Sequence, residues 1–507
     1  MKTTSTPLIF KKAYCVASAQ VYLDRPPPGL AFLSGVCSKH NLDHDICDLN
    51  LKALEILTED QYARLAEVTP FYPLTDADAI NLINTVIDPV CVDIKNSGAD
   101  LIMLTVLTYH QNVWAEQFLK RLKHYNIQAT IIVGGSGIAV PQTDGQSWAR
   151  HRADEGLIDY YVLGEGDQVL DEFLKGNTAL GINSKDAKTD SWAIQVEDLD
   201  QTPVPSYGKF VLKEYQRLEQ GTGISLTGSR GCVRRCTFCD VGHYWKKFRF
   251  RNGKSIAEEI EKHYLETGSL SYFFTDSLIN GSLKMFHDMM EHIIKIRQKH
   301  NGMPGLKING QYIVRPKQFH KEEHYRLMRD SGVIELDTGV ESGSDRVREH
   351  MGKKFSNEDI DYHMEMCSKY GIMNNLLMLV AYPTETRKDF EDTINMIKKY
   401  QKYHIDGTVV DVSESLPLIL LKNTPLYDMV DELGITGHDR DEYNNLTYDI
   451  KSNPELDIKE RFSRYIEFQK TLINLNYQRP GRVPIHLEEM TKVIKRFSEE
   501  KIKNVRT

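Results

Sequence analysis

The sequence lacks any long apolar run that would cross a membrane or direct export. It has no stretch of about 18 consecutive apolar residues, the usual minimum for a membrane-spanning helix. The apolar segment of a secretory signal is also absent from the amino-terminal sequence, MKTTSTPLIFKKAYCV. We therefore expect a cytoplasmic protein that has no membrane partner.

An excess of positive charge is missing as well. The formal net charge of the 507 residues is −8, whereas proteins that bind nucleic acids in general are usually basic. Hydrophobic residues make up 41% of the chain and charged residues 26%, which is typical of a soluble globular protein. The negative net charge leads us to expect no nucleic-acid partner. Because the chain is too long for one ordinary hydrophobic core, we expect two or three domains.

Cysteine is scarce, with eight residues in the whole chain. Five of them stand alone, which in a reducing cytosol is typical of small buried hydrophobic residues. These five are Cys15, Cys37, Cys47, Cys91 and Cys367. The other three fall within eight positions, and that clustering requires a chemical explanation.

Residues 1–178 alternate between strand-like and helix-like segments. Residues 99–106, ADLIMLTV, have the pattern of a buried strand, and a helix over 112–124 places Trp114, Phe118 and Leu122 on one face. This alternation predicts an α/β domain with a Rossmann-like, doubly wound parallel sheet, which binds ligands at the carboxyl ends of its strands. The predicted strands are 11–17, 45–49, 99–106, 127–133 and 158–163, and the predicted helices include 29–40 and 112–124.

A second alternating series covers residues 221–430. Its six strand–helix units predict a partial, TIM-like (βα)6 barrel with functional groups at the carboxyl ends of its strands. The predicted strands are 224–228, 270–275, 306–311, 333–340, 373–380 and 407–412, and the helices between them are 256–267, 283–300, 319–330, 357–370 and 387–400. Residues 179–220 are polar and contain Thr202-Pro203-Val204-Pro205, which favours an extended linker. Residues 431–507 are predicted to be mostly helical.

The clustered cysteines follow the first strand of the second series. They are Cys232, Cys236 and Cys239, with the spacing Cys-x3-Cys-x2-Cys. Thiolates bind iron–sulfur clusters, and an ordinary cluster takes four of them, so three would leave one iron open to a chelating ligand. A zinc site with His243 as the fourth ligand and unrelated thiols are the alternatives.

At this point the chain resembles the radical SAM superfamily, which has the same cysteine spacing after the first strand of a partial barrel. Phe238 matches the aromatic residue that precedes the third cysteine in that family. The resemblance implies a [4Fe–4S] cluster whose open iron is chelated by S-adenosylmethionine (SAM). It implies that the reduced cluster cleaves SAM to a 5′-deoxyadenosyl radical, with electrons from a donor such as flavodoxin or ferredoxin.

Further motifs of the family follow in order. Asp276 ends a segment that resembles the second-strand motif, and Glu341 and Ser342 lie in Gly-Val-Glu-Ser-Gly-Ser at 339–344. The resemblance implies that these three residues and Phe238 contact SAM. Residues 381–386 and 423–426 resemble the family's G-x-P-x-E-T and G-T-P-L elements, although neither has the usual glycine. Ordinary roles remain open, with Asp276 as a helix cap and Glu341 paired with an arginine such as Arg315.

The first domain resembles the cobalamin-binding domain found beside some radical SAM domains. The resemblance rests on Thr105-x-Leu107, followed after 26 residues by Gly134-Gly135, and on Gly164-Glu165-Gly166 and an early Pro-Pro-x-Gly-Leu loop. It implies that Thr105, Leu107, Gly134, Gly135, Gly164 and Glu165 contact cobalamin. No Asp-x-His-x-x-Gly motif supplies a lower histidine ligand, and a cobalamin-free Rossmann-like domain is the alternative.

Together, these resemblances predict a cobalamin-dependent radical SAM enzyme. We expect it to methylate an unactivated carbon or a phosphinate in a small-molecule substrate. A radical ring rearrangement or oxidative cyclisation without methyl transfer is the alternative. A tRNA methylthiotransferase and a non-catalytic cobalamin or iron–sulfur sensor are less favoured.

Overall fold

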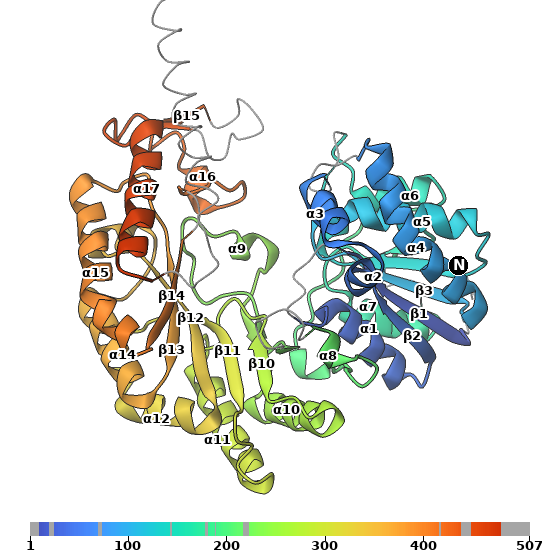
Figure 1. Ribbon diagram of the computed structural model, residues 1–507, viewed down its shortest axis with the longest axis horizontal. Helices are drawn as coiled ribbons and strands as arrows, with labels where there is room; N and C mark the ends of the chain where they lie inside the picture. The colour runs from blue at the N-terminus through green and yellow to red at the C-terminus, as the bar shows by residue number, and fades with distance from the viewer. Residues whose placement is uncertain are drawn as a thin grey trace, which may run out of the picture. The chain divides into compact units, whose positions relative to one another are not determined.

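The computed structural model divides the chain into two compact units (Figure 1). One contains Met1–Ser225 and Glu258–Ser271, and the other contains Leu226–Ala257 and Tyr272–Thr507. The structure describes residues 10–19, 25–68, 74–141, 144–177, 181–187, 189–215, 223–414, 417–437 and 448–477. Within these ranges no helix combines the length and apolarity needed to cross a membrane.

The first unit is built on a sheet of six strands in the order β2-β1-β3-β4-β5-β6. All neighbouring pairs are parallel except β5 with β6. The predicted doubly wound α/β sheet is therefore confirmed. The strands are β1 (Lys12–Ala17), β2 (Asp43–Asp48), β3 (Leu101–Thr105), β4 (Thr130–Gly134), β5 (Tyr160–Tyr161) and β6 (Asn183–Ser184).

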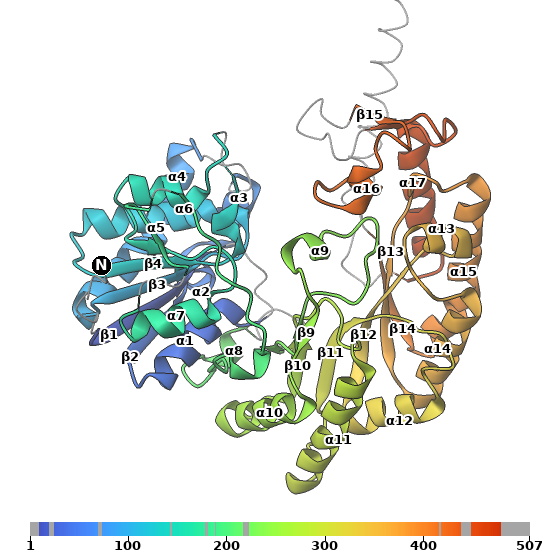
Figure 2. The same ribbon diagram turned by 180° about the vertical axis from the view of Figure 1, so that it is seen from behind.

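Helices cover both faces of this sheet (Figures 1 and 2). Alternate strand residues enter two separate cores: Leu104 packs in one core with helices such as α5, and Met103 packs in the other with α1 and α7. The helices are α1 (Pro28–Lys39), α2 (Leu49–Ile56), α3 (Glu59–Val68), α4 (Ala77–Ser97), α5 (Asn112–His124), α6 (Trp148–Asp154) and α7 (Gly166–Leu174). The five isolated cysteines are all buried, as predicted.

Much of the segment expected to be a linker packs on the first unit. Besides β6, it contains the short helix α8 (Leu212–Tyr215) and the buried residues Val196, Leu199 and Tyr207. A side chain on Gly35 of α1 would collide with the carbonyl oxygen of Val204. The boundaries of the predicted domains at 178 and 220 stay predictions.

The second unit is built on six strands in the order β14-β13-β12-β11-β10-β7. The pairs from β11 to β14 are parallel. The end strands β7 and β14 are not neighbours in this order, so the sheet is open, as a partial barrel requires. The strands are β7 (Ile224–Leu226), β10 (Ser271–Phe274), β11 (Lys307–Tyr312), β12 (Val333–Glu341), β13 (Met373–Met378) and β14 (Val409–Glu414).

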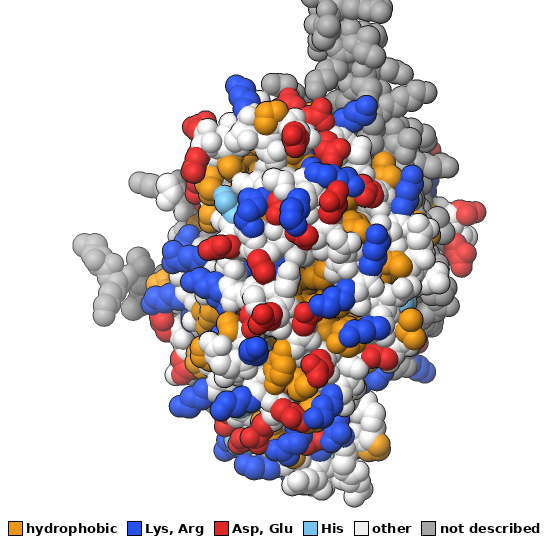
Figure 3. Space-filling view, turned by 90° about the vertical axis from the view of Figure 1, so that its left-hand side faces the viewer, with side chains coloured by type: hydrophobic (Ala, Val, Ile, Leu, Met, Phe, Trp, Pro, Cys, Tyr) orange, Lys and Arg blue, Asp and Glu red, His pale blue; other side chains and the backbone are white. Residues whose placement is uncertain are grey.

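The helices of the second unit begin and end at recognisable caps. Ser356 and Asp359 form a capping box at the start of α14, which ends at Gly371 in the left-handed region. Positive and negative side chains are interspersed on the side of this unit that contains α14 and α15 (Figure 3). The main helices are α10 (Gly253–Thr267, divided between the two units), α11 (Leu283–Lys299), α12 (Glu322–Ser331), α14 (Asn357–Tyr370) and α15 (Arg387–Ile405).

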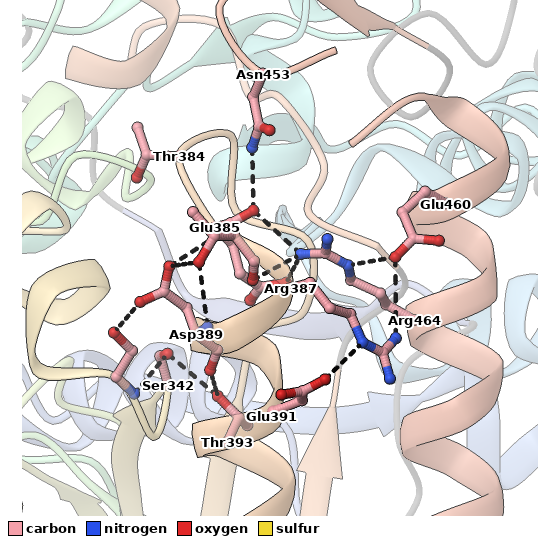
Figure 4. Close-up of polar contacts among 12 residues, drawn as sticks. Ser342, Thr384, Glu385, Arg387, Asp389, Glu391, Thr393, Asn453, Glu460 and Arg464 are labelled. Carbon is pink, nitrogen blue, oxygen red and sulfur yellow. Dashed lines mark hydrogen bonds and ion pairs between the residues drawn. The ribbon is translucent and has the colours of Figure 1, made fainter. Parts of the chain in front are cut away.

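The described carboxyl-terminal residues contain a two-stranded hairpin, β15 (Ile435–Thr436) with β16 (Asp449–Ile450), and the helix α17 (Ile458–Asn474). A buried ion pair fastens α17: Arg464 Nη1 donates to Glu385 Oε1 at 3.0 Å, and both side chains are 1% exposed (Figure 4). A second pair, Arg387 with Glu467 at 2.8 Å, lies near the surface. The predicted helical tail from 478 to 507 lies outside the described residues.

The Arg464→Met variant should lose about 3–5 kcal/mol of unfolding free energy, because it leaves the Glu385 carboxylate buried without its cation. The matched Arg387→Met variant should lose at most about 1 kcal/mol, because its ion pair is largely exposed. Denaturant unfolding at neutral pH measures both. Equal losses of unfolding free energy in the two variants would contradict the larger contribution assigned to the buried pair.

Candidate active site

The three clustered cysteines lie on a loop between two short strands. The antiparallel hairpin of β8 (Ser229–Arg230) with β9 (Arg249–Phe250) closes this loop at its base. Gly231 has a φ of +85°, and a Cβ there would lie 2.7 Å from the carbonyl oxygen of Lys247. Glycine is therefore required where the chain turns from β8 into the cysteine loop.

The three thiols lie close together: those of Cys232 and Cys239 are near enough to Cys236 to act on its pKa. Burial raises the pKa of the Cys236 thiol to about 11, and the other two thiols add to this shift. The ammonium of Lys353 opposes it, because a nearby cation favours the thiolate. Bound iron would supply the positive charge that three neighbouring thiolates need, so the loop fits a metal cluster.

A single metal ion fits this loop less well than a cluster. Among the residues that the structure describes, no three His, Cys, Asp or Glu side chains converge as ligands of one ion. A cubane does not require such convergence, because each thiolate binds a different iron. His243, the fourth ligand in the zinc alternative, lies exposed on the short helix α9 (Val241–Tyr244).

Hydrogen bonds from distant segments hold the middle of the cysteine loop. Thr237 donates its backbone N–H to the carbonyl oxygen of Met351 at 3.0 Å and accepts from the N–H of Leu426 at 2.7 Å. Its hydroxyl lies 2.7 Å from the buried Tyr382 hydroxyl, which also contacts His350 Nδ1 at 2.8 Å. Tyr382 occupies a variable position of the motif at 381–386, and the sequence did not indicate that it contacts this loop.

Asp276 braces the start of the same loop. Its carboxylate accepts hydrogen bonds from the N–H of Gly228 at 2.8 Å and from the hydroxyl of Ser229 at 2.6 Å. Burial raises the pKa of Asp276 to about 7 against the opposing effect of these bonds. The helix-cap alternative is wrong, because Ser282 caps α11. A contact between Asp276 and SAM stays a prediction.

Glu341 lies at the end of β12, where the register with β13 shifts and the backbone has a φ of +69°. Its carboxylate pairs with Lys353, whose Nζ lies 2.7 Å from Glu341 Oε1. Arg315, the suggested partner, instead donates to the carbonyl oxygens of Asn280 and Gly281. Lys353 was not indicated by the sequence, because nothing in its local pattern marks a residue that pairs across the fold.

Ser342 and Phe238 occupy different surroundings. Ser342 is fully buried, and its hydroxyl lies 3.3 Å from the Thr393 hydroxyl and accepts from the N–H of Ser344 at 3.1 Å (Figure 4). The ring of Phe238 lies 5.8 Å from the Lys353 ammonium. The structure thus brings Phe238, Glu341 and the cysteines around one lysine, and it places Ser342 inside the adjoining turn. Their contacts with SAM stay predictions.

Two motif positions that lack the family's usual glycine adopt a glycine-like backbone. Ala381 has a φ of +61°, and Asn423 has a φ of +64°. Asparagine tolerates the left-handed region, whereas alanine is strained there. The backbone shape of both motifs is therefore present without the residue that most easily adopts it.

Three of the residues predicted to bind cobalamin meet at the carboxyl edge of the first sheet. Thr105 ends β3 and pairs in register with Gly134 at the end of β4. Gly135 has a φ of +105°, and a Cβ there would collide with the carbonyl oxygen of Val106. A Cβ on Gly29 would lie 2.5 Å from Thr105 Oγ1. The chain order reverses between β1 and β3, which is where doubly wound sheets bind ligands.

The remaining residues predicted to bind cobalamin are placed less uniformly. Leu107 is 52% exposed beside this edge, although it is apolar. Gly164 has a φ of +93°. The carboxylate of Glu165 is buried and accepts from the N–H of Val196 at 2.9 Å, so it ties down the following segment. Gln111, which the sequence did not indicate, bonds through its side chain to the backbone of Ser18 and Thr108.

Comparison with known proteins identifies the second unit. The sequence model of the radical SAM superfamily matches residues 226–397. The chain therefore contains a radical SAM domain. Its radical SAM domain includes the three cysteines, Asp276 and Glu341. Because radical SAM domains use SAM and a [4Fe–4S] cluster, the prediction of these two cofactors is confirmed.

Curated relatives align with this chain well beyond that domain. An uncharacterized methyltransferase from Pyrococcus horikoshii is 24% identical over 386 residues, which cover 74% of this chain and 73% of the relative. A cytidylyl-2-hydroxyethylphosphonate methyltransferase from Streptomyces wedmorensis is 22% identical over 382 residues, which cover 67% of this chain and 65% of the relative.

Solved structures share the fold of this chain. The methyltransferase TsrM from Kitasatospora setae, with tryptophan substrate and a SAM analog bound, has a TM-score of 0.59 and 17% identity, covering 84% of this chain and 76% of TsrM. The cobalamin-dependent enzyme OxsB, with aqua-cobalamin bound, has a TM-score of 0.63 and 15% identity, covering 96% of this chain and 71% of OxsB.

The Gly231→Ala variant should bind substantially less iron and sulfide after anaerobic reconstitution, because its side chain would force the cysteine loop to shift. Gly242→Ala is a matched control, since a Cβ on Gly242 meets nothing within 4 Å. Chemical iron analysis and visible absorbance measure the outcome. Full iron content in Gly231→Ala would contradict the assigned turn.

The pH dependence of stability should report the burial of Asp276. Its pKa is about 7 in the folded protein against an ordinary value of 3.8. The stabilising contribution of the protonated carboxyl is therefore complete below pH 3.8 and is lost as the pH rises through 7, by up to about 1.4 kcal/mol per pH unit. Unfolding of the metal-free protein between pH 5 and 8 should show this loss, and Asp276→Asn should reduce it. The same pH dependence of stability in wild type and in Asp276→Asn would contradict the role assigned to the Asp276 carboxyl.

Proposed function

We propose that this radical SAM enzyme depends on cobalamin and methylates an unactivated carbon or a phosphinate of a small-molecule substrate. One observation carries the proposal: the chain joins a radical SAM domain to a doubly wound unit, and two relatives whose alignments cover 74% and 67% of this chain are named methyltransferases. A reducing compartment suits this chemistry, so we propose the cytoplasm.

In this proposal Cys232, Cys236 and Cys239 hold the cluster. A cluster bound there would supply the electron for SAM cleavage, and the proposed source of that electron is a donor such as flavodoxin or ferredoxin. The contacts of Asp276 and Tyr382 with the loop support its shape before the cofactor binds. Phe238, Asp276, Glu341 and Ser342 are the proposed SAM contacts.

The first unit is the proposed cobalamin domain. Thr105, Gly134 and Gly135 lie together at the strand ends where such sheets bind ligands, and Leu107 offers exposed apolar surface beside them. The shared fold with TsrM and OxsB, whose structures contain cobalamin, supports this assignment. Bound cobalamin would supply a methyl carrier. Gly164 and Glu165 are the remaining proposed contacts.

A radical cyclisation without methyl transfer is the second candidate. An anaerobic magnesium-protoporphyrin IX monomethyl ester cyclase from Cereibacter sphaeroides is 22% identical over 263 residues, which cover 48% of this chain. This similarity favours a reaction in which the substrate radical closes a ring. Transfer of labelled methyl groups separates the two candidates.

A methylthiotransferase is less favoured. A putative methylthiotransferase from Methanocaldococcus jannaschii is 24% identical over 286 residues, which cover 54% of this chain. The resemblance to that group implies additional cluster cysteines in the first unit. Here the four cysteines of that unit are buried in its cores, where they pack as hydrophobic residues: Cys15, Cys37, Cys47 and Cys91.

Anaerobic reconstitution with iron, sulfide, cobalamin, reductant and methyl-labelled SAM tests the proposal. The wild-type enzyme should produce 5′-deoxyadenosine and transfer labelled methyl to a small molecule from a library of amines, indoles and phosphinates. Cys236→Ala should abolish 5′-deoxyadenosine formation, because a ligand is lost. Cys367→Ala, the same substitution at a buried cysteine outside the loop, should retain it.

Each outcome of this experiment has a defined meaning. Absence of 5′-deoxyadenosine in reactions with the wild-type protein would reject radical chemistry. A non-catalytic cobalamin or iron–sulfur sensor would then be the remaining hypothesis. Formation of 5′-deoxyadenosine with a modified product that contains no label would favour cyclisation. Labelled product without bound cobalamin would reject the cobalamin part.

A further inference from the structure

A buried cation lies beside the cysteine loop. The side chain of Lys353 is 7% exposed, and its ammonium has three contacts. It donates to Glu341 Oε1 at 2.7 Å and to the carbonyl oxygen of Gly339 at 3.2 Å, and it lies 5.8 Å from the centre of the Phe238 ring. These contacts hold the charge between the end of β12 and the residue that precedes Cys239.

The backbone on both sides of Lys353 is also held. Lys353 donates its N–H to the carbonyl oxygen of Arg348, at the end of α13 (Asp345–His350). The preceding Gly352 has a φ of +80°, and a Cβ there would lie 3.1 Å from the carbonyl oxygen of Arg235 on the cysteine loop. The ammonium is thus set in place by main-chain packing as well as by its own hydrogen bonds.

The cation acts on all three cysteines. Lys353 lies within electrostatic reach of Cys232, Cys236 and Cys239, and Glu341 lies within reach of Cys236. A second cation, Arg315, acts on Cys232 and donates to the neutral carbonyl oxygens of Asn280 and Gly281. Lys353 and Glu341 are therefore a pair of opposite charges beside the thiols. Removal of Lys353 and removal of Glu341 should change the electrostatic potential at the thiols in opposite directions.

We propose that Lys353 is a positioning residue that raises the reduction potential of the cluster, and that Glu341 lowers it. This inference rests on the cluster-binding part of the proposed function. Reduction adds one electron from an external reductant, so the cluster with its three thiolates becomes more negative by one charge. A buried ammonium stabilises that added charge, and a buried carboxylate destabilises it, with little screening by water.

A redox titration followed by electron paramagnetic resonance tests the proposal. Wild type and variants are reconstituted anaerobically with iron and sulfide and titrated with dithionite, without SAM, cobalamin or substrate. Lys353→Met should decrease the ratio of reduced to oxidised cluster about tenfold at a fixed potential, which equals about 59 mV for a one-electron couple. Glu341→Gln should shift the ratio in the opposite direction.

Two further variants separate charge from packing. Lys353→Arg keeps the positive charge and should restore the wild-type potential. Lys354→Met makes the same change at the next residue, which is exposed, and should leave the potential unchanged. If Lys353→Met fails to retain iron, the opposite shift in Glu341→Gln still decides the matter, and an unshifted potential in that variant overturns the proposal.

The result is independent of the enzyme's reaction. A wild-type protein that binds no cluster would reject the proposed function before this inference is reached. A cluster whose potential is the same in wild type, Lys353→Met and Glu341→Gln would reject the inference alone. Methyl transfer, or its absence, bears on neither outcome.

Discussion

The site depends on hydrogen bonds that reach a nearly structureless loop from other parts of the second unit. Between β8 and β9 the chain has only one short helix, so the loop cannot define its own shape. Asp276 holds its start, and Tyr382 and Met351 hold its middle at Thr237. These anchors follow different strands of one sheet, so the position of three thiols depends on the correct assembly of the whole barrel.

Much of the fold was predictable because buried parallel strands leave a simple pattern. All six strands of the second sheet lie within a few residues of their predicted places, since each is a short segment between stretches of helical periodicity. Helices α2 to α4 were not predicted, and α4 contains Pro89 within its length. Residues 179–220 were expected to form a linker because their sequence is polar. Val196, Leu199 and Tyr207 are nevertheless buried, and such isolated apolar residues leave no periodic pattern.

The site was predictable only in part, because a motif gives the identity of residues and not their partners. The cysteines and Glu341 stood out by spacing. The partner of Glu341 was misjudged, since Arg315 and Lys353 are equally plausible cations until the packing is known. Glu165 shows the same limit: its motif did not indicate that its carboxylate accepts a hydrogen bond from the backbone of Val196.

Ala381 and Asn423 show how far the surroundings control the local chain. Both hold a left-handed backbone at positions where the similar motifs have glycine. The neighbours of Ala381, including the buried Tyr382 and Glu385, are tied down firmly enough to impose that conformation on a residue that resists it. The glycine of such a motif can therefore be replaced in evolution while the backbone conformation of the motif persists. Sequence searches that require the glycine will overlook homologues of this enzyme.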